Sequence, residues 1–127
     1  MARETFFPNP DNKPVGYSPA TRVGDTVFAS GHVSVDATGN IVGKGDPGAQ
    51  SEQAFQNVEA ALKAAGVTIA DVTKITCFLV NVADYGAYAA VRLRLFTENG
   101  PASSTVVVKE LVKPEYLVEI EAIAVVG

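Results

Sequence analysis

Residues 117–126 read Leu-Val-Glu-Ile-Glu-Ala-Ile-Ala-Val-Val, and the fold expected for this chain follows from that run. Branched apolar residues dominate it, which is typical of a β-strand. Because side chains alternate between the two faces of a strand, Glu119 and Glu121 share one face with apolar neighbours. The run therefore predicts a strand that carries two carboxylates on a largely apolar face.

These two carboxylates have two interpretations. Burying an ionised carboxylate without a partner raises its pKa, and a raised pKa suits a general acid or a group that orients water. Alternatively, the strand lies at the edge of the sheet and both acids are solvated. The residues alone leave both interpretations open.

The segments before this strand alternate between helical and strand patterns. Residues 104–112 are rich in β-formers, and residues 73–82 are apolar enough for a central strand covered on both sides. Residues 50–65 repeat apolar side chains at helical spacing and stop at Gly66, which predicts an amphipathic helix. Residues 84–98 predict a second helix, with an aspartate available as its N-cap.

The N-terminal third has strand and turn signals. Residues 26–35 carry β-formers, and the turn chemistry that follows them precedes Ile41-Val42, so we expect a hairpin between these two segments. The first twenty residues contain four of the seven prolines, which favours an extended peripheral arm.

The expected order is β-β-α-β-α-β-β, which indicates an α+β fold in a single domain over residues 1–127. Each helix has one apolar stripe, so both should cover the same face of one mixed sheet. The other face is also apolar in the last three strands and needs a cover. Self-association is the simplest cover, and a pocket would then form between subunits.

Composition narrows the function classes. Fourteen acidic and ten basic residues give a net charge of −4 without a basic stripe, so a nucleic-acid partner is not expected. No apolar run approaches the roughly 20 residues of a membrane span, and the first residues lack a signal-peptide pattern, so we expect a cytoplasmic protein with no membrane partner. A lone cysteine and a lone histidine exclude an internal disulfide and a structural zinc site.

Three motifs have plain structural interpretations. Residues 43–48 match G-x-G-x-x-G, but Asp46 would oppose a pyrophosphate, so we interpret them as a glycine-rich loop. His32 titrates near neutral pH, yet its place in a predicted strand favours a packed histidine over a general base. Cys77 lies mid-strand with no base nearby in the sequence, which indicates a core residue.

The order of several short motifs identifies a family. They are Gly16-Tyr-Ser18, Phe28-Ala-Ser-Gly-His32, Asn57-Val58 with Ala64-Ala-Gly66, Gly100-Pro-Ala-Ser-Ser104 and Val118-Glu-Ile-Glu-Ala-Ile-Ala124. Over essentially its whole length the chain resembles the Rid family, also called the YjgF/YER057c/UK114 family. The resemblance implies a chorismate-mutase-like fold, assembled as a homotrimer with substrate clefts between subunits.

The same resemblance implies a chemistry. Members of the family hydrolyse reactive imines and enamines to a carbonyl compound and ammonia, and they use no metal or cofactor. An arginine in a Pro-Ala-Arg-Ser turn binds the substrate carboxylate in these deaminases, whereas this chain has Ser103 there. Ala89 stands where the deaminases carry an asparagine. A hydroxyl cannot neutralise a carboxylate, so we expect a substrate other than a simple 2-imino acid.

The resemblance also implies roles for individual residues. Glu119 would be catalytic and position the water that attacks the C=N carbon. A separate hypothesis comes from helical spacing and not from the resemblance: Arg92, three residues after Ala89, would replace the missing anion clamp, although a solvated side chain is the plainer interpretation. The expected substrate-binding residues are Tyr17, Ser30, Ser103, Ser104, Thr105 and Arg92.

Three functions follow, in order of preference. The first is a deaminase or related hydrolase of an imine or enamine metabolite. The second is a non-catalytic trimer that binds a small metabolite in its clefts. The third is an endoribonuclease or translation inhibitor, which the acidic chain with a single histidine disfavours.

Overall fold

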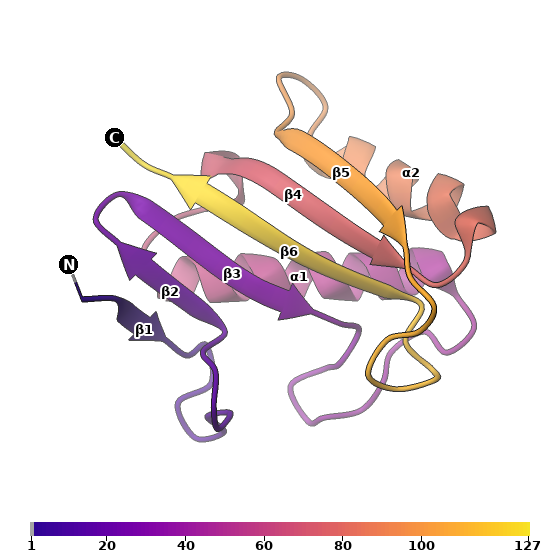
Figure 1. The fold of residues 1–127 in the computed structure, drawn as a ribbon, viewed down its shortest axis with the longest axis horizontal. Coiled ribbons are helices and arrows are strands. Elements are labelled where there is room, and N and C mark those ends of the chain that lie inside the picture. The colour runs from indigo at the N-terminus through magenta and orange to yellow at the C-terminus, as the bar shows by residue number, and fades with distance from the viewer. Residues whose placement is uncertain (1) are drawn as a thin grey trace.

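The computed structural model describes residues 2–127, which form one six-stranded sheet with two helices on the same side of it (Figure 1). The strands are β1 (Glu4–Phe6), β2 (Ala20–Val23), β3 (Thr26–His32), β4 (Val72–Leu79), β5 (Ala102–Val107) and β6 (Val118–Val125); the helices are α1 (Pro47–Ala64) and α2 (Tyr85–Leu95), and two 3₁₀ turns are η1 (Ile69–Asp71) and η2 (Val82–Asp84). The strand order is β1-β2-β3-β6-β4-β5, and only β4 and β5 run parallel. This arrangement confirms the predicted α+β fold.

The N-terminal third differs from the prediction. β3 forms its hairpin with β2 and not with residues 41–42, and β1 lies within the predicted arm, where it pairs with β2 at the sheet edge. The turn after β3 does form, but it closes only an isolated bridge between Val35 and Ile41. The predicted hairpin is therefore wrong and two strands, β1 and β2, were missed, because they are three and four residues long and their partners are chosen by tertiary contacts.

The helices follow the predicted pattern with different ends. α1 begins three residues early, at Pro47, because Asp46 accepts a hydrogen bond from the backbone nitrogen of Ala49 at 3.1 Å and so caps the helix. α2 is shorter than the predicted 84–98. Asp84 stands at its N-cap position, but its side chain makes no capping hydrogen bond.

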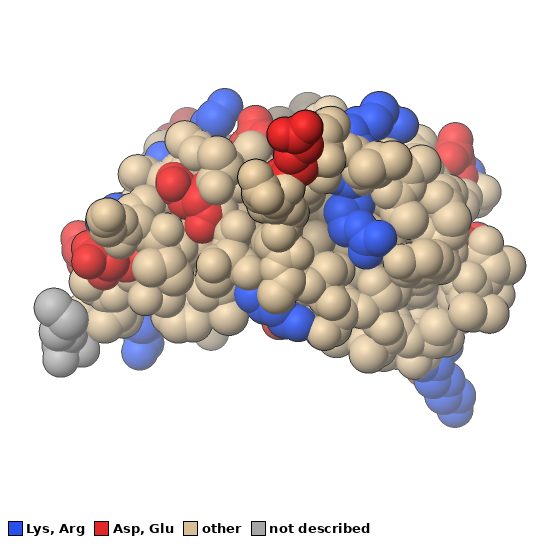
Figure 2. All heavy atoms as spheres, turned by 90° about the horizontal axis from the view of Figure 1, so that it is seen from above, with Lys and Arg blue, Asp and Glu red and all other residues tan. Residues whose placement is uncertain are grey.

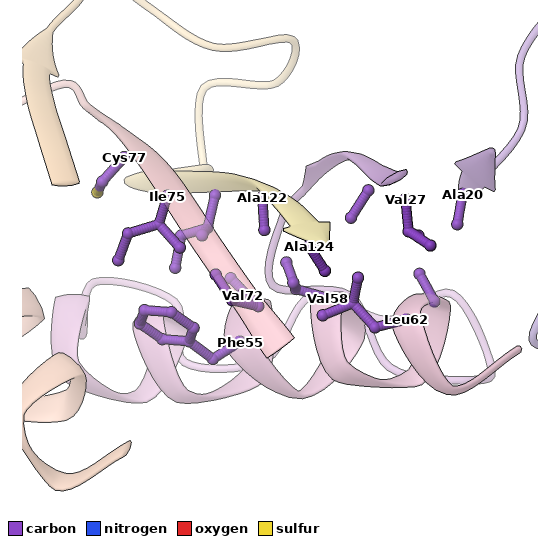
Figure 3. Packing of buried hydrophobic residues seen from close by; sticks show 14 of the residues in the cluster. Ala20, Val27, Phe55, Val58, Leu62, Val72, Ile75, Cys77, Ala122 and Ala124 are labelled. Carbon is purple, nitrogen blue, oxygen red and sulfur yellow. The ribbon is translucent and has the colours of Figure 1, made fainter. Parts of the chain in front are cut away.

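The core lies between α1 and the sheet (Figure 3). Phe55, Val58 and Leu62 point from α1 toward the sheet, Phe55 below Ile75 of β4 and Val58 and Leu62 below Ala124 of β6. From β6 the even-numbered residues are buried on this side, so the odd-numbered ones lie on the other face. The alternation confirms that Glu119 and Glu121 share a face. The buried β6 residues are Val118, Ile120, Ala122 and Ala124.

One buried amide connects α1 to the start of β6. The Gln50 side chain is fully buried, and its Nε2 donates to the backbone oxygens of Gly43 and Glu115 at 3.2 and 2.9 Å. Its Oε1 accepts from the backbone nitrogen of Leu117 at 2.9 Å. Both donors and the acceptor are therefore satisfied, as a buried amide requires.

The face of the sheet away from the helices is uncovered in the single chain, and we call it the open face. Phe28 on β3, Val106 on β5 and Val125 on β6 are 43%, 44% and 46% exposed there. Phe78 and Ile123 lie among them, half-buried. The predicted apolar sheet surface is present. Among residues 2–127, no helix combines the length and apolarity needed to span a bilayer.

Candidate functional site

Glu119 lies on the open face of an interior strand. β6 is hydrogen-bonded to β3 on one side and to β4 on the other, so the alternative of an edge strand is wrong. Glu119 stands opposite Phe78 and is half-buried, whereas Glu121 is exposed. The two acids therefore share a face but have different environments.

A glycine makes room for the Glu119 carboxyl group. A β-carbon at Gly31 would lie 2.9 Å from the carboxyl carbon of Glu119 and 3.1 Å from its Oε1, closer than real contacts allow. Gly31 is in an irregular part of β3, where the pairing with β6 shifts between Ala29 and His32. The side chain of Glu119 therefore lies against bare backbone.

This environment changes the acidity of Glu119. Burial raises the pKa of its carboxyl group, and repulsion from the Glu121 carboxylate raises it further. Within residues 2–127, no salt bridge to Glu119 offsets this rise. A carboxylate with raised pKa and little solvation is a better proton acceptor than one in water.

Ser30 and Tyr17 lie on the same side of the molecule. The hydroxyl of Ser30 donates to the backbone oxygen of Ser18 at 2.6 Å, and its backbone nitrogen donates to Pro19. These bonds hold the segment containing Tyr17 beside β3, with the tyrosine side chain 61% exposed. The structure thus places Ser30 next to Gly31, against which Glu119 lies, and ties the segment that follows Tyr17 to the same part of β3.

Arg92, Ser103 and Thr105 lie elsewhere, in a groove between α2 and β5. The groove has a volume of about 840 Å³, and Ala89 also lines it, as the helical spacing predicts. Arg92 donates from Nη1 to the Ser103 hydroxyl at 3.3 Å and from Nη2 to the Tyr85 hydroxyl at 3.0 Å. The guanidinium also lies over the Tyr85 and Tyr88 rings, 5.6 and 5.4 Å from their centroids.

The predicted site residues therefore form two groups on opposite sides of the sheet. In β5, Ser103 pairs with buried Ile75 and Ser104 pairs with Thr76, so consecutive serines face opposite ways. Ser104 accepts a hydrogen bond from Lys74 Nζ at 2.6 Å on the open face. Within one chain, Glu119 and the groove with Ser103 do not face each other.

Other candidates have structural surroundings. His32 lies within hydrogen-bonding distance of the Pro19 oxygen, at 3.3 Å, and burial lowers the pKa of its ring. Burial raises the pKa of Cys77 to about 12, as expected for a core thiol. Tyr85 and the buried Tyr88 were not among the expected site residues. Their spacing from Arg92, seven and four residues, places them on the same helix face and was the signal in the sequence that could have found them.

Comparison with known proteins identifies the family. The family model described as Endoribonuclease L-PSP matches residues 11–126. The chain belongs to the Rid family. A solved structure of a Yersinia pestis Rid family protein, YyfA, superposes with a TM-score of 0.88 at 32% identity and covers 98% of this chain and 100% of that one.

Two Rid family relatives have names that state an activity. A 2-iminobutanoate/2-iminopropanoate deaminase of Dermatophagoides farinae is 38% identical over 115 residues, 90% of this chain and 89% of that protein. A 3-aminoacrylate deaminase, RutC, of Acinetobacter baylyi is 35% identical over 125 residues, 98% of both chains. Both of these relatives are therefore named as deaminases.

Proposed function

We propose that this chain is a cytoplasmic deaminase that hydrolyses an imine or enamine metabolite, with Glu119 as the catalytic residue. One observation carries the proposal: a carboxylate with raised pKa lies half-buried on an interior strand against the bare backbone of Gly31. In the described part of the chain no cation pairs with this carboxylate, and activation of solvent is the reason we propose for a charge in that place. The deaminase names of the two relatives support the same chemistry.

We further propose that the site is completed between copies of the chain, in a homotrimer. Strands β6 and β5 are separated by β4, so they lie about 10 Å apart, and Glu119 and Ser103 face opposite ways. A small substrate cannot contact both within one subunit. The uncovered apolar face supports association, because copies packed there would bury Phe28 and Val125.

In the proposed mechanism the substrate reacts as its protonated imine, and Glu119 holds a water molecule and accepts a proton from it as the oxygen attacks the C=N carbon. The resulting carbinolamine carries one hydroxyl and one amino group on the same carbon. Glu119 returns its proton to the nitrogen and then accepts the hydroxyl proton as the C–N bond breaks, so that ammonia and a carbonyl compound leave and this last proton passes to solvent. An enamine enters the same sequence after protonation at carbon converts it into the protonated imine. Water is the only co-reactant.

The substrate-binding roles of Tyr17, Ser30, Ser104 and Thr105 belong to this proposal. Ser30 hydrogen-bonds to the N-terminal segment that contains Tyr17. We propose that these bonds position Tyr17 at the cleft between subunits. Ser103 supplies a hydroxyl where a guanidinium is expected from the family resemblance, so we propose a substrate different from a simple 2-imino acid.

Ammonia release tests the proposal. Enzyme-generated 2-aminoacrylate and a panel of cyclic imines are supplied to the protein and to its Glu119→Gln variant, which keeps the size of the side chain and removes its basicity. We expect the variant to be about 100-fold slower or worse, the usual contribution of a general base. The matched control is Glu121→Gln, which changes the exposed acid two residues away and should retain most of the activity.

Equal ammonia release by the native protein and Glu119→Gln would overturn the proposed deaminase. Saturable binding of a metabolite without turnover would then favour the non-catalytic binding protein, the second function expected from the sequence.

The name of the matched family model favours one other candidate, an endoribonuclease. We rank it lower because the basic side chains on the surface seen in Figure 2 are scattered among acidic ones. His32, the only histidine, is half-buried, and burial lowers the pKa of its ring. Cleavage of ribosomal RNA that persists through repeated purification and disappears in Glu119→Gln would reverse this ranking.

A further inference from the structure

The charge of Arg92 is uncompensated. The ion pairs among residues 2–127 are Lys63–Glu59 and Arg94–Glu52, so no carboxylate in that range pairs with Arg92. Its hydrogen bonds go to two neutral hydroxyl oxygens, on Tyr85 and Ser103. A guanidinium has five N–H donors, so donors remain for a further acceptor.

Arg92 is nevertheless held in a defined position. The two hydroxyls fix it from α2 and β5, and two tyrosine rings flank it. Ordering a long side chain loses conformational entropy, so an arginine that is simply solvated is not expected to make four such contacts. The arrangement presents a rigid cation to the groove, as carboxylate recognition requires.

A second observation is the hydroxyl of Tyr88. This side chain is fully buried, and its oxygen has no hydrogen-bond partner in the structure. Burial raises the pKa of Tyr88, while the nearby Arg92 and Ser103 act in the opposite direction, so the hydroxyl lies beside the same guanidinium. Buried hydroxyls without partners are uncommon in proteins. Tyr88 does not line the groove, so its buried ring and hydroxyl support the guanidinium from the core side and do not contact an occupant.

The rest of the groove indicates the size and polarity of the occupant. Leu93, Phe96 and Pro101 line it together with Ala89 and Gly100, and no second basic residue does. One guanidinium and neutral hydroxyls match a singly charged anion better than a phosphate, which recruits several positive groups. The apolar lining suits a short carbon chain.

We propose that Arg92, held by Tyr85 and Ser103 and supported by the buried Tyr88, binds the carboxylate of a small organic acid in the groove between α2 and β5. The anion anchor is thus a residue of helix α2, on the helix side of β5. The assignment of this carboxylate to the imine substrate rests on the proposed function. The binding site for a carboxylate does not depend on that function.

Calorimetric titration with pyruvate tests the site, with uncharged methyl pyruvate as the ligand control. We expect saturable binding of pyruvate and none of the ester. Arg92→Ala should weaken pyruvate binding about 30-fold or more, as loss of a charged hydrogen-bonded partner does. Arg92→Lys should recover part of the affinity, because it keeps the charge and loses the planar fork. Tyr88→Phe should weaken binding less than Arg92→Ala.

The matched control is Arg94→Ala, which removes an arginine of the same helix that pairs with Glu52 outside the groove. It should bind pyruvate as the native protein does. Absence of pyruvate binding to the native protein, or equal affinity in Arg92→Ala with an unchanged melting temperature, would overturn the inference.

Glu119→Gln separates this inference from the proposed function. If pyruvate binding depends on Arg92 but the protein releases no ammonia, the anion site is supported and the deaminase is overturned. Ammonia release that depends on Glu119, together with a pyruvate affinity that is unchanged in Arg92→Ala, keeps the deaminase and overturns the anion site.

Discussion

At the scale of single residues, position in the sheet makes Glu119 and Glu121 chemically different. Both face the same side of β6, as the sequence alternation predicts. Only Glu119 is opposite Phe78 and against Gly31, so burial acts on it most strongly. The sequence alone left a solvated edge strand open, because the neighbours of β6 come from distant segments.

The raised pKa of Glu119 predicts the pH dependence of deamination. The base form is the active one, so kcat/KM should rise with pH along an ionisation whose midpoint lies above the ordinary value of 4.5. Glu121→Gln removes a repulsive charge and should move that midpoint to lower pH. The measurement is a pH–rate profile, with Glu110→Gln in a distant loop as control. An unchanged midpoint in Glu121→Gln would contradict the prediction.

The same ionisation affects folding with a definite sign. Below 4.5 Glu119 is protonated in both states and contributes no pH dependence. Above it the unfolded chain releases the proton first, so the free energy of unfolding falls until the folded group also ionises. Glu119→Gln should therefore be at least as stable as the native protein at neutral pH, even though it is inactive.

At the scale of elements, the irregular end of β3 positions the candidate catalytic group. The strand pattern of residues 26–32 was predictable from composition, and α1 from its apolar spacing. The shift in pairing at Ser30 and Gly31 was not, because it depends on the register with β6, almost ninety residues away. Local sequence likewise predicted both helices but not the cap that starts α1 early.

Gly31→Ala tests the role of this irregular segment. The added β-carbon would meet the Glu119 carboxyl group, which must then move. A displacement of about 1 Å at a catalytic group can reduce the rate about 100-fold, so we expect a loss of that order in ammonia release. The melting temperature should change little, because the carboxyl group can rotate away.

The control for that variant is Gly86→Ala in α2. A β-carbon there meets nothing within 4 Å, so the change should stabilise the helix by about 0.5–1 kcal/mol and leave activity intact. Full activity in Gly31→Ala would show that the close approach of Gly31 and Glu119 is without catalytic importance.

At the scale of the whole molecule, two helices cover one face of the sheet and leave the other bare. The uncovered face was predictable, because two helices with one apolar stripe each can cover only one face of a sheet whose last three strands are apolar on both faces. The grouping of site residues was not predictable, because Ser103 and Ser104 point to opposite sides and the two groups meet only if copies associate.

A charge on the open face tests association. Phe28→Glu places a carboxylate in the centre of the proposed interface, where it would lose solvation without a partner. We expect the mass from light scattering to fall from that of a trimer to the 13.3 kDa of one chain, with loss of ammonia release. Val112→Glu, at a loop residue that is 90% exposed, should keep the native mass. An unchanged mass in Phe28→Glu would contradict the proposed interface.

The buried amide of Gln50 has a consequence for how this scaffold tolerates length variation. Gln50 clamps the backbone on both sides of Tyr116, immediately before β6 begins, from a fixed point on α1. The stretch between the end of β5 and the residues bonded to Gln50, residues 108–114, can consequently gain or lose residues while Glu119 keeps its position against Gly31. Insertions near residue 112 would alter the outer rim of the molecule and leave its chemistry in place.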